Sequence, residues 1–225
     1  MGYHTLHWHL DSIRQQLLAM GTAVEEMIAD ATLAILRRDQ ALAERTLAND
    51  KAVDRLEMEI DEACHSVIAR NHPTAVDMRM LVAAMKITAD LERMGDSAVN
   101  MVQAASKLNG QPPLAHDFDL ERMSVLVQAM VRGAIDAFMR RDVGAATQIC
   151  QDDDAVDDAY RRAFDGLLAL MSRDPSTVAR GVHLVLVARN LERIADHATN
   201  VAEDVIYYVD GRDIRHPLAV QQPPT

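Results

Sequence analysis

The sequence predicts an all-α protein made of two tandem repeated three-helix bundles, with six long antiparallel helices. Apolar side chains recur every three or four residues, as Leu17, Met20, Val24 and Met27 do, and this spacing places them along one face of a helix. No stretch alternates between apolar and polar residues as a half-buried strand does. Aromatic residues form only 4% of the chain, whereas Ala, Met, Leu and Val supply most of its hydrophobic residues, so the composition also favours helix over sheet.

Breaks in the helical periodicity divide the 225 residues into six segments. The first helix ends at an Arg-Arg-Asp turn (37–39), and the second ends at Asn-His-Pro (71–73). The third helix ends at Asn-Gly-Gln-Pro-Pro (109–113), which is the longest break and marks the main linker. A second Arg-Arg-Asp turn (140–142) ends the fourth helix, and Arg-Asp-Pro (173–175) separates the fifth from the sixth.

The two halves of the chain on either side of the linker repeat each other, which changes the fold prediction from one bundle to two. The sequence therefore predicts one domain over residues 1–110 and a second over residues 111–225. The matching segments are Leu36–Asp39 with Met139–Asp142, Asp50–Asp54 with Asp153–Asp157, and Leu91–Asp96 with Leu191–Asp196.

Acidic residues four positions apart recur in both halves, on the second and third helix of each. A spacing of four places each pair on one helix face, where like charges repel unless water or a cation offsets them. Because consecutive helices run antiparallel, we expect four carboxylates to converge in each half. A single acidic pair is usually solvated surface, but recurrence of both pairs in both halves makes a metal or polar site an equal alternative. For a metal, an oxygen-only ligand set suits magnesium, manganese or iron better than zinc. The candidate ligands are Asp50, Asp54, Glu92 and Asp96 in the first half and Asp153, Asp157, Glu192 and Asp196 in the second.

Other polar residues flank the acidic pairs. Asn100 and Asn200 lie one turn further along their helices and could supply a carbonyl ligand, although a hydrogen bond is favoured. Arg93 and Arg193 point away from the acidic face, and we expect each to brace a neighbour through a salt bridge. His197 has no histidine counterpart in the first half and is expected at the surface or behind the ligands.

Charge and composition exclude several classes of protein. With 34 acidic and 23 basic residues the chain carries a formal charge of -11 and has no basic run, which argues against nucleic-acid binding and against a basic membrane-surface helix. The beginning of the chain lacks a signal-peptide pattern and no stretch is long and apolar enough to span a membrane, so we expect a cytoplasmic protein. Cys64 and Cys150 form no Cys-x-x-Cys motif, which argues against a disulfide framework and a thiolate metal site.

Enzyme hypotheses receive limited support. A di-iron carboxylate oxidase needs two Glu-x-x-His motifs, and Glu62–His65 supplies one, but its counterpart in the second half has no histidine. The histidines at positions 4, 7 and 9 have no repeat partner, and no Gly-rich phosphate loop or nucleophile elbow is present. A metal-dependent enzyme or metal store that uses the carboxylates remains the alternative, and a purely structural helical scaffold is a third possibility.

Several phrases of the sequence resemble those of one known family. Taken together along nearly the whole chain, they are similar to the PhoU family of phosphate-signalling proteins. They are Met20-Gly21, Pro73–Ala75 followed by Asp77–Arg79, Leu91–Asp96, Ala188–Asp196 and the ending Tyr207–His216.

The resemblance implies a non-enzymatic protein that restrains high-affinity phosphate uptake and the phosphate-starvation response when phosphate is plentiful. It also implies a homodimer whose partners are the ATPase component of a phosphate ABC transporter and a sensor histidine kinase, so that any membrane contact is made through those partners. Members of the family carry an acid-x-x-x-Asp motif on the second and third helices as a metal-cluster site. All eight candidate ligands named above fall on that motif.

Overall fold

Six α-helices account for almost all of the structure, a computed structural model that describes residues 2–114 and 119–214. Within these ranges there is no strand, so the predicted all-α fold is confirmed. None of the helices in the same ranges is long and apolar enough to cross a membrane. The helices are α1 (Gly2–Arg37), α2 (Gln40–Asn71), α3 (Ala75–Leu108), α4 (Leu120–Arg140), α5 (Val143–Arg173) and α6 (Val178–Asp210), with a short 3₁₀ helix, η1 (Pro175–Thr177), before α6.

The two Arg-Arg-Asp breaks adopt the same conformation, which explains why they stop one helix and begin the next. Arg38 and Arg141 have positive φ values of 55° and 57°, a left-handed conformation that ends α1 and α4. The aspartates that follow are helix N-caps. Asp39 accepts a hydrogen bond from the Ala41 amide, and Asp142 accepts one from Ala145, each at 2.9 Å. The repeated sequence is therefore a repeated turn.

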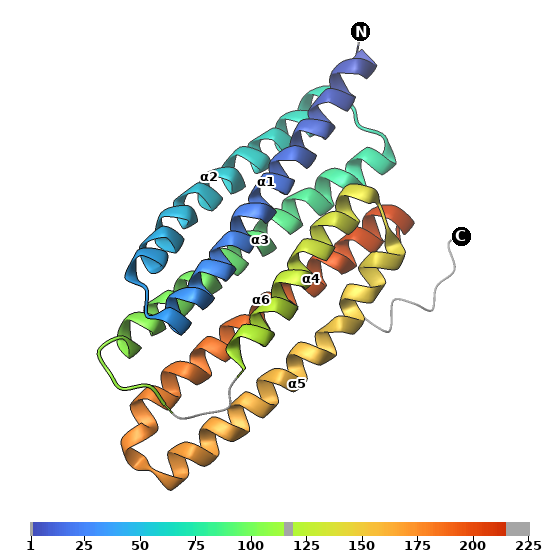
Figure 1. Cartoon of the computed structure of the whole chain (residues 1–225). Coiled ribbons are helices and arrows are strands. Elements are labelled where there is room, and N and C mark those ends of the chain that lie inside the picture. The colour runs from blue at the N-terminus through green and yellow to red at the C-terminus, as the bar shows by residue number, and fades with distance from the viewer. Residues whose placement is uncertain (1, 115–118, 215–225) are drawn as a thin grey trace.

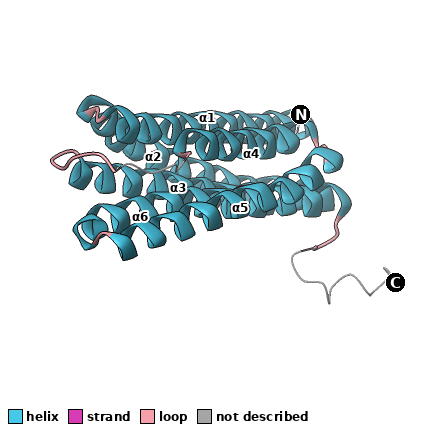
Figure 2. Cartoon of the chain, turned by 60° about the horizontal axis from the view of Figure 1, so that its bottom comes forward, coloured by secondary structure: helices cyan, strands magenta, loops and turns pink. Residues whose placement is uncertain are grey.

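The helices form two three-helix bundles, α1–α3 and α4–α6, that lie side by side (Figure 1). The helices share one long direction, as Figure 2 shows from a second side. Within the described residues the bundles meet where α3 packs on α6 and α1 packs on α4, whereas α2 and α5 contact only helices of their own bundle. The predicted domain boundary at residues 110 and 111 falls in the segment between α3 and α4.

The apolar stripes form one core that continues from one bundle into the other. Leu17, Met20 and Val24 on α1 are fully buried, as the spacing predicts. Gly21 lies between them and faces α4, where a Cβ atom on residue 21 would stand only 2.8 Å from Cγ1 of Ile135. This glycine therefore allows the two bundles to approach closely.

Polar contacts also join the two bundles across α3 and α6. Lys86 Nζ lies 2.8 Å from a carboxylate oxygen of Asp204, and His197 Nδ1 lies 2.8 Å from Oδ1 of Asp90. Asn200 donates a longer hydrogen bond, 3.4 Å, to the same Asp90 oxygen, which confirms the predicted role for that amide. The predicted surface position of His197 is wrong, because its side chain is 14% exposed and contacts the opposite bundle. The alternative position behind the ligands stays a prediction, and His197 does lower the pKa of Asp196, against the effect of burial.

Candidate functional site

The first acidic cluster is formed where α2 and α3 run antiparallel, as the sequence predicts. Burial raises the pKa of Asp50, and the negative charges of Asp54 on the same helix and of Asp96 on α3 raise it further. The pKa of Glu92 is raised by burial and by Asp96, Glu57 and Asp54. The four predicted residues of the first half therefore share one electrostatic environment.

Glu57 is a fifth carboxylate of this cluster that the sequence analysis missed. It lies one turn beyond Asp54 on α2, and its pKa is raised by burial and by Asp61 and Asp54, while Arg93 opposes the shift. The spacing of three from Asp54 was a usable signal. Recurrence between the halves does not reveal Glu57, because the corresponding residue of the second half is Tyr160.

The second cluster repeats the arrangement on α5 and α6. Burial is the largest cause that raises the pKa of Asp153 to about 6, followed by the charges of Asp196 and Asp157. The Thr199 hydroxyl has a smaller opposing effect on that pKa, yet it makes no hydrogen bond of normal geometry. The pKa of Glu192 is likewise raised, by burial and then by Asp196.

The second cluster differs from the first because a cation is hydrogen-bonded to one of its carboxylates. Arg189 donates a short hydrogen bond to Glu192 and lies 5.8 Å from the centre of the Tyr160 ring. It also lowers the pKa of Asp196, against the effect of burial. The corresponding position of the first half is Ala89, so the first cluster has five acids and no equivalent of this arginine. The repeat pattern did not reveal this asymmetry.

The residues present are of the chemical type that a hard cation prefers, but their side chains are not grouped around one point. The ligands offered are carboxylate oxygens, and Oε2 of Glu192 is buried with no hydrogen-bond partner, as expected for an atom that lacks a cation. In the described part of the chain, however, no three His, Cys, Asp or Glu side chains are close enough together to hold one metal ion. The helices thus bring the predicted ligands to common faces, and the side-chain rotamers do not focus them on one point.

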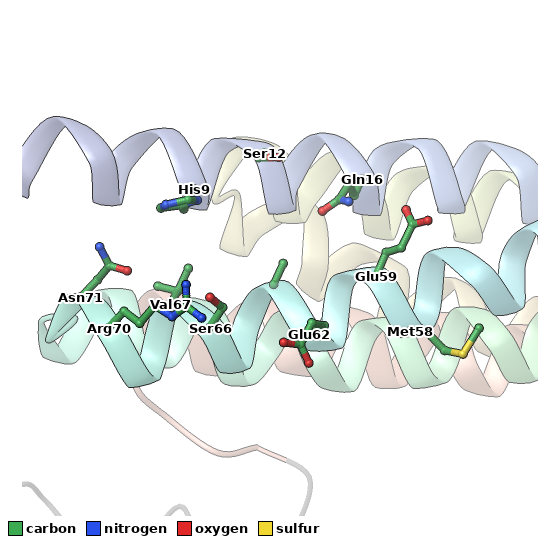
Figure 3. Close-up of a pocket in the computed structure, with 11 residues that line it drawn as sticks. His9, Ser12, Gln16, Met58, Glu59, Glu62, Ser66, Val67, Arg70 and Asn71 are labelled. Carbon is green, nitrogen blue, oxygen red and sulfur yellow. The ribbon is translucent and has the colours of Figure 1, made fainter.

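A groove of about 620 Å³ between α1 and α2 lies apart from the residues of both clusters (Figure 3). His9 of α1 and Arg70 of α2 face each other across it, and Glu62, the first residue of the single Glu-x-x-His motif, lies on its α2 side. His65 does not line the groove and is exposed, while the Cys64 thiol is buried with a pKa raised to about 12, mainly by burial. The side chain of His4 lies outside the described residues. The motif therefore gathers no ligand set here.

The fold and the paired acidic faces define a class of helical protein built from two tandem three-helix repeats, each with its own carboxylate cluster. Comparison with known families places the chain within that class, because the PhoU domain family matches residues 17–105 and 120–205. The chain belongs to the PhoU family, as the sequence phrases predicted.

Known relatives and solved structures are similar to this chain over nearly its whole length. The phosphate-specific transport system accessory protein PhoU homolog of Pseudomonas aeruginosa is 38% identical over 92% of this chain and 86% of its own length. The corresponding protein PhoU of Escherichia coli is 36% identical over the same shares. The crystal structure of PhoU from P. aeruginosa superposes with a TM-score of 0.88 at 36% identity, covering 91% of this chain and 99% of that one. The phosphate transport system regulatory protein PhoU from Streptococcus pneumoniae gives 0.86 at 26% identity, covering 94% and 100%.

Proposed function

We propose that the protein is a non-enzymatic negative regulator of high-affinity phosphate uptake and of the phosphate-starvation response. The observation that carries this proposal is the match, over about nine-tenths of the chain, to proteins named as accessory to phosphate-specific transport. The structural neighbour from S. pneumoniae is also named a regulatory protein. A helical adaptor with long exposed faces suits this role, because regulation of a transporter requires contact surfaces rather than a reaction centre.

In this proposal the protein acts in the cytoplasm as a homodimer and couples a phosphate ABC transporter, through its ATPase component, to a sensor histidine kinase. It reaches the membrane only through these partners. The two bundles offer two related but unequal acidic surfaces, so one could serve each partner. Pull-down of the ATPase and of the kinase by the full chain, with its mass measured by light scattering, tests the partners and the dimer separately.

We also propose that the carboxylate clusters bind magnesium, manganese or iron, with zinc a poorer fit to ligands that are all oxygen. The candidate ligands are Asp50, Asp54, Glu92 and Asp96, extended by Glu57, and Asp153, Asp157, Glu192 and Asp196. When bound, the cation offsets the repulsion between the carboxylates and ties α2 to α3 or α5 to α6. The first cluster should bind more tightly, because Arg189 already neutralises part of the second.

Deletion of the gene tests the regulatory role. A phosphate-starvation reporter should become active in high phosphate, and the wild-type gene should restore its repression. Unchanged repression in the deletion strain would overturn the proposal.

Elemental analysis and thermal unfolding test the metal sites. Wild-type protein equilibrated with manganese and dialysed should retain the metal and melt at a higher temperature, whereas the Asp54→Ala/Asp96→Ala variant should lose the contribution of the first cluster. A Glu44→Ala/Glu121→Ala variant removes two exposed acids outside the clusters and serves as the control for net charge. Equal metal retention by all three proteins would exclude the first cluster as a metal site.

The alternative is a metal-dependent enzyme or a metal store, which the carboxylate clusters also favour. Oxidase, phosphatase or iron-loading turnover that disappears in the Asp54→Ala/Asp96→Ala variant and persists in the control would support it over the adaptor. Metal binding without turnover would support the adaptor.

A further inference from the structure

A pocket of about 420 Å³ lies between the second half of α3 and the first half of α6, on the surface where the two bundles meet. Its volume is in the range of small-molecule sites. No carboxylate lines it, although the chain has 34 acidic residues and a formal charge of -11. The polar side chains that line it are Lys107, Arg189, Arg193, His183, Asn100, Gln103 and Asn190.

The internal repeat supplies a comparison, because α3 and α6 correspond at an offset of 100 residues. The opposite end of the same helix pair carries acids where the pocket carries amides. Asp90 corresponds to Asn190, and Glu203 corresponds to Gln103. At that end the polar groups satisfy one another, since His197 and Asn200 contact Asp90. At the pocket end the acids have been replaced.

A third replacement has the same effect. Asp204, which pairs with Lys86 at 2.8 Å, corresponds to Ala104 in the wall of the pocket. Lys107 stands where the other end has Tyr207. The pocket end has therefore gained a cation and lost three potential anionic partners relative to its repeat.

Of the three cations that line the pocket, one forms a salt bridge with a carboxylate in the described residues. Arg189 pairs with Glu192. Within residues 2–114 and 119–214, Lys107 and Arg193 form no salt bridge, so the bracing ion pair predicted for Arg193 is absent there. The Arg193 guanidinium lowers the pKa of Asp196, against the effect of burial, so the negative charge of that carboxylate reaches it, but no carboxylate lines the space that Arg193 and Lys107 share with the amide side chains.

We propose that this pocket binds a phosphate-type oxyanion. Guanidinium, ammonium and amide groups together offer many donors, which exceeds what the two oxygens of a single carboxylate can accept. An anion with three or four terminal oxygens and about two negative charges matches both the donors and the two cations that form no salt bridge in the described residues. The inference rests on the lining of the pocket and does not require the regulatory role proposed above. Because the site joins α3 to α6, its occupancy links the two bundles.

Isothermal titration calorimetry of the full chain with orthophosphate, pyrophosphate and ATP tests the proposal. The three probes distinguish a free oxyanion from the phosphate groups of a nucleotide. Titration in excess EDTA removes any phosphate held through a metal at the carboxylate clusters. We expect at least one probe to bind.

Two variants locate the binding. Lys107→Gln/Arg193→Gln should weaken it at least about tenfold, the usual effect of losing hydrogen bonds to charged groups. Gln103→Glu is nearly isosteric and restores the acid of the opposite end, so its carboxylate should compete with the ligand for the cations. Arg122→Gln/Arg173→Gln removes two exposed cations elsewhere and should bind as the wild type does.

Circular dichroism confirms that each variant is folded before titration. Loss of binding in the pocket variants but not in the control supports the proposal, whichever probe binds. Absence of binding for all three probes overturns it, and so does equal affinity of the wild-type and pocket-variant proteins. An equal loss in the control would assign the binding to net charge and would also overturn it.

Discussion

Replacement of Asp153 by Asn should stabilise the metal-free protein at neutral pH. Asp153 is half-buried among other carboxylates, and its pKa is raised from 3.8 to about 6, first by burial and then by Asp196 and Asp157. Ionisation of this group in the folded protein is therefore unfavourable. Asn has a similar shape and cannot ionise, so it removes the unfavourable charge while keeping the packing.

The magnitude follows from the size of that shift. Two pKa units correspond to about 3 kcal/mol of free energy, at about 1.4 kcal/mol per unit. Because the Asp153 side chain is only partly buried and solvent screens it, we expect a gain of about 1–1.5 kcal/mol in the free energy of unfolding for Asp153→Asn.

The pH dependence has a definite sign. A carboxyl group whose pKa is raised on folding stabilises the fold while it is protonated, and this contribution is lost as the pH rises from the unfolded-state pKa near 4 through the folded-state value near 6. The advantage of Asp153→Asn should therefore be complete at pH 7.5 and should fall to less than half by pH 4.5.

Urea unfolding followed by circular dichroism, in EDTA and at both pH values, measures the effect. Asp152→Asn is the matched control, because it removes the same charge from an exposed neighbour and keeps the oxygen that accepts from Gln148 at 2.9 Å. The control should change stability by less than about 0.5 kcal/mol. The reasoning is refuted if Asp153→Asn is less stable than the wild type at pH 7.5, or if the two variants gain equally.

Two further changes test the contact between the bundles, both by urea unfolding. His197→Ala should destabilise the protein by about 1–3 kcal/mol, because Asp90, which is 6% exposed, loses its nearest partner at 2.8 Å and keeps only the longer contacts with Asn200 and Arg93. A loss below about 0.5 kcal/mol would contradict this. Gly21→Ala should cost up to about 2 kcal/mol, since overpacking against buried Ile135 (about 1–3 kcal/mol) exceeds the gain of about 1 kcal/mol in helix propensity. Gly110→Ala is the control, because a Cβ there meets nothing within 4 Å, and its stability should stay within about 0.5 kcal/mol of the wild type. A Gly21→Ala protein more stable than the wild type would contradict the expected overpacking against Ile135.

Local chemistry made the fold predictable from the sequence. The helix ends predicted at the Arg-Arg-Asp segments are correct because a left-handed residue and an aspartate cap need only neighbours a few positions away in the chain. The predicted burial of Leu17, Met20 and Val24 is correct because helical spacing alone determines which side chains share a face.

The candidate metal sites were predictable only in part. Spacing and recurrence correctly indicated that acids of neighbouring helices share one electrostatic environment, because the charge of Asp96 on α3 contributes to the raised pKa of Asp50 on α2. The expected convergence of four carboxylates on one point is not seen among the described residues. Recurrence hid Glu57 and Arg189, because neither has a like counterpart in the other half. Whether the clusters bind metal stays a prediction.

The sequence by itself determined the six helices, the duplication and the helix faces that carry the acids, because each depends on neighbours along the chain. Only the tertiary structure decided what those faces meet. The antiparallel register of α3 against α6 brings His197 to Asp90 at one end and gathers Lys107 and Arg193 around an acid-free pocket at the other. Such pairings depend on which helices pack together and on how far each is shifted along the other. Residue spacing within one helix determines neither the packing partner nor the shift.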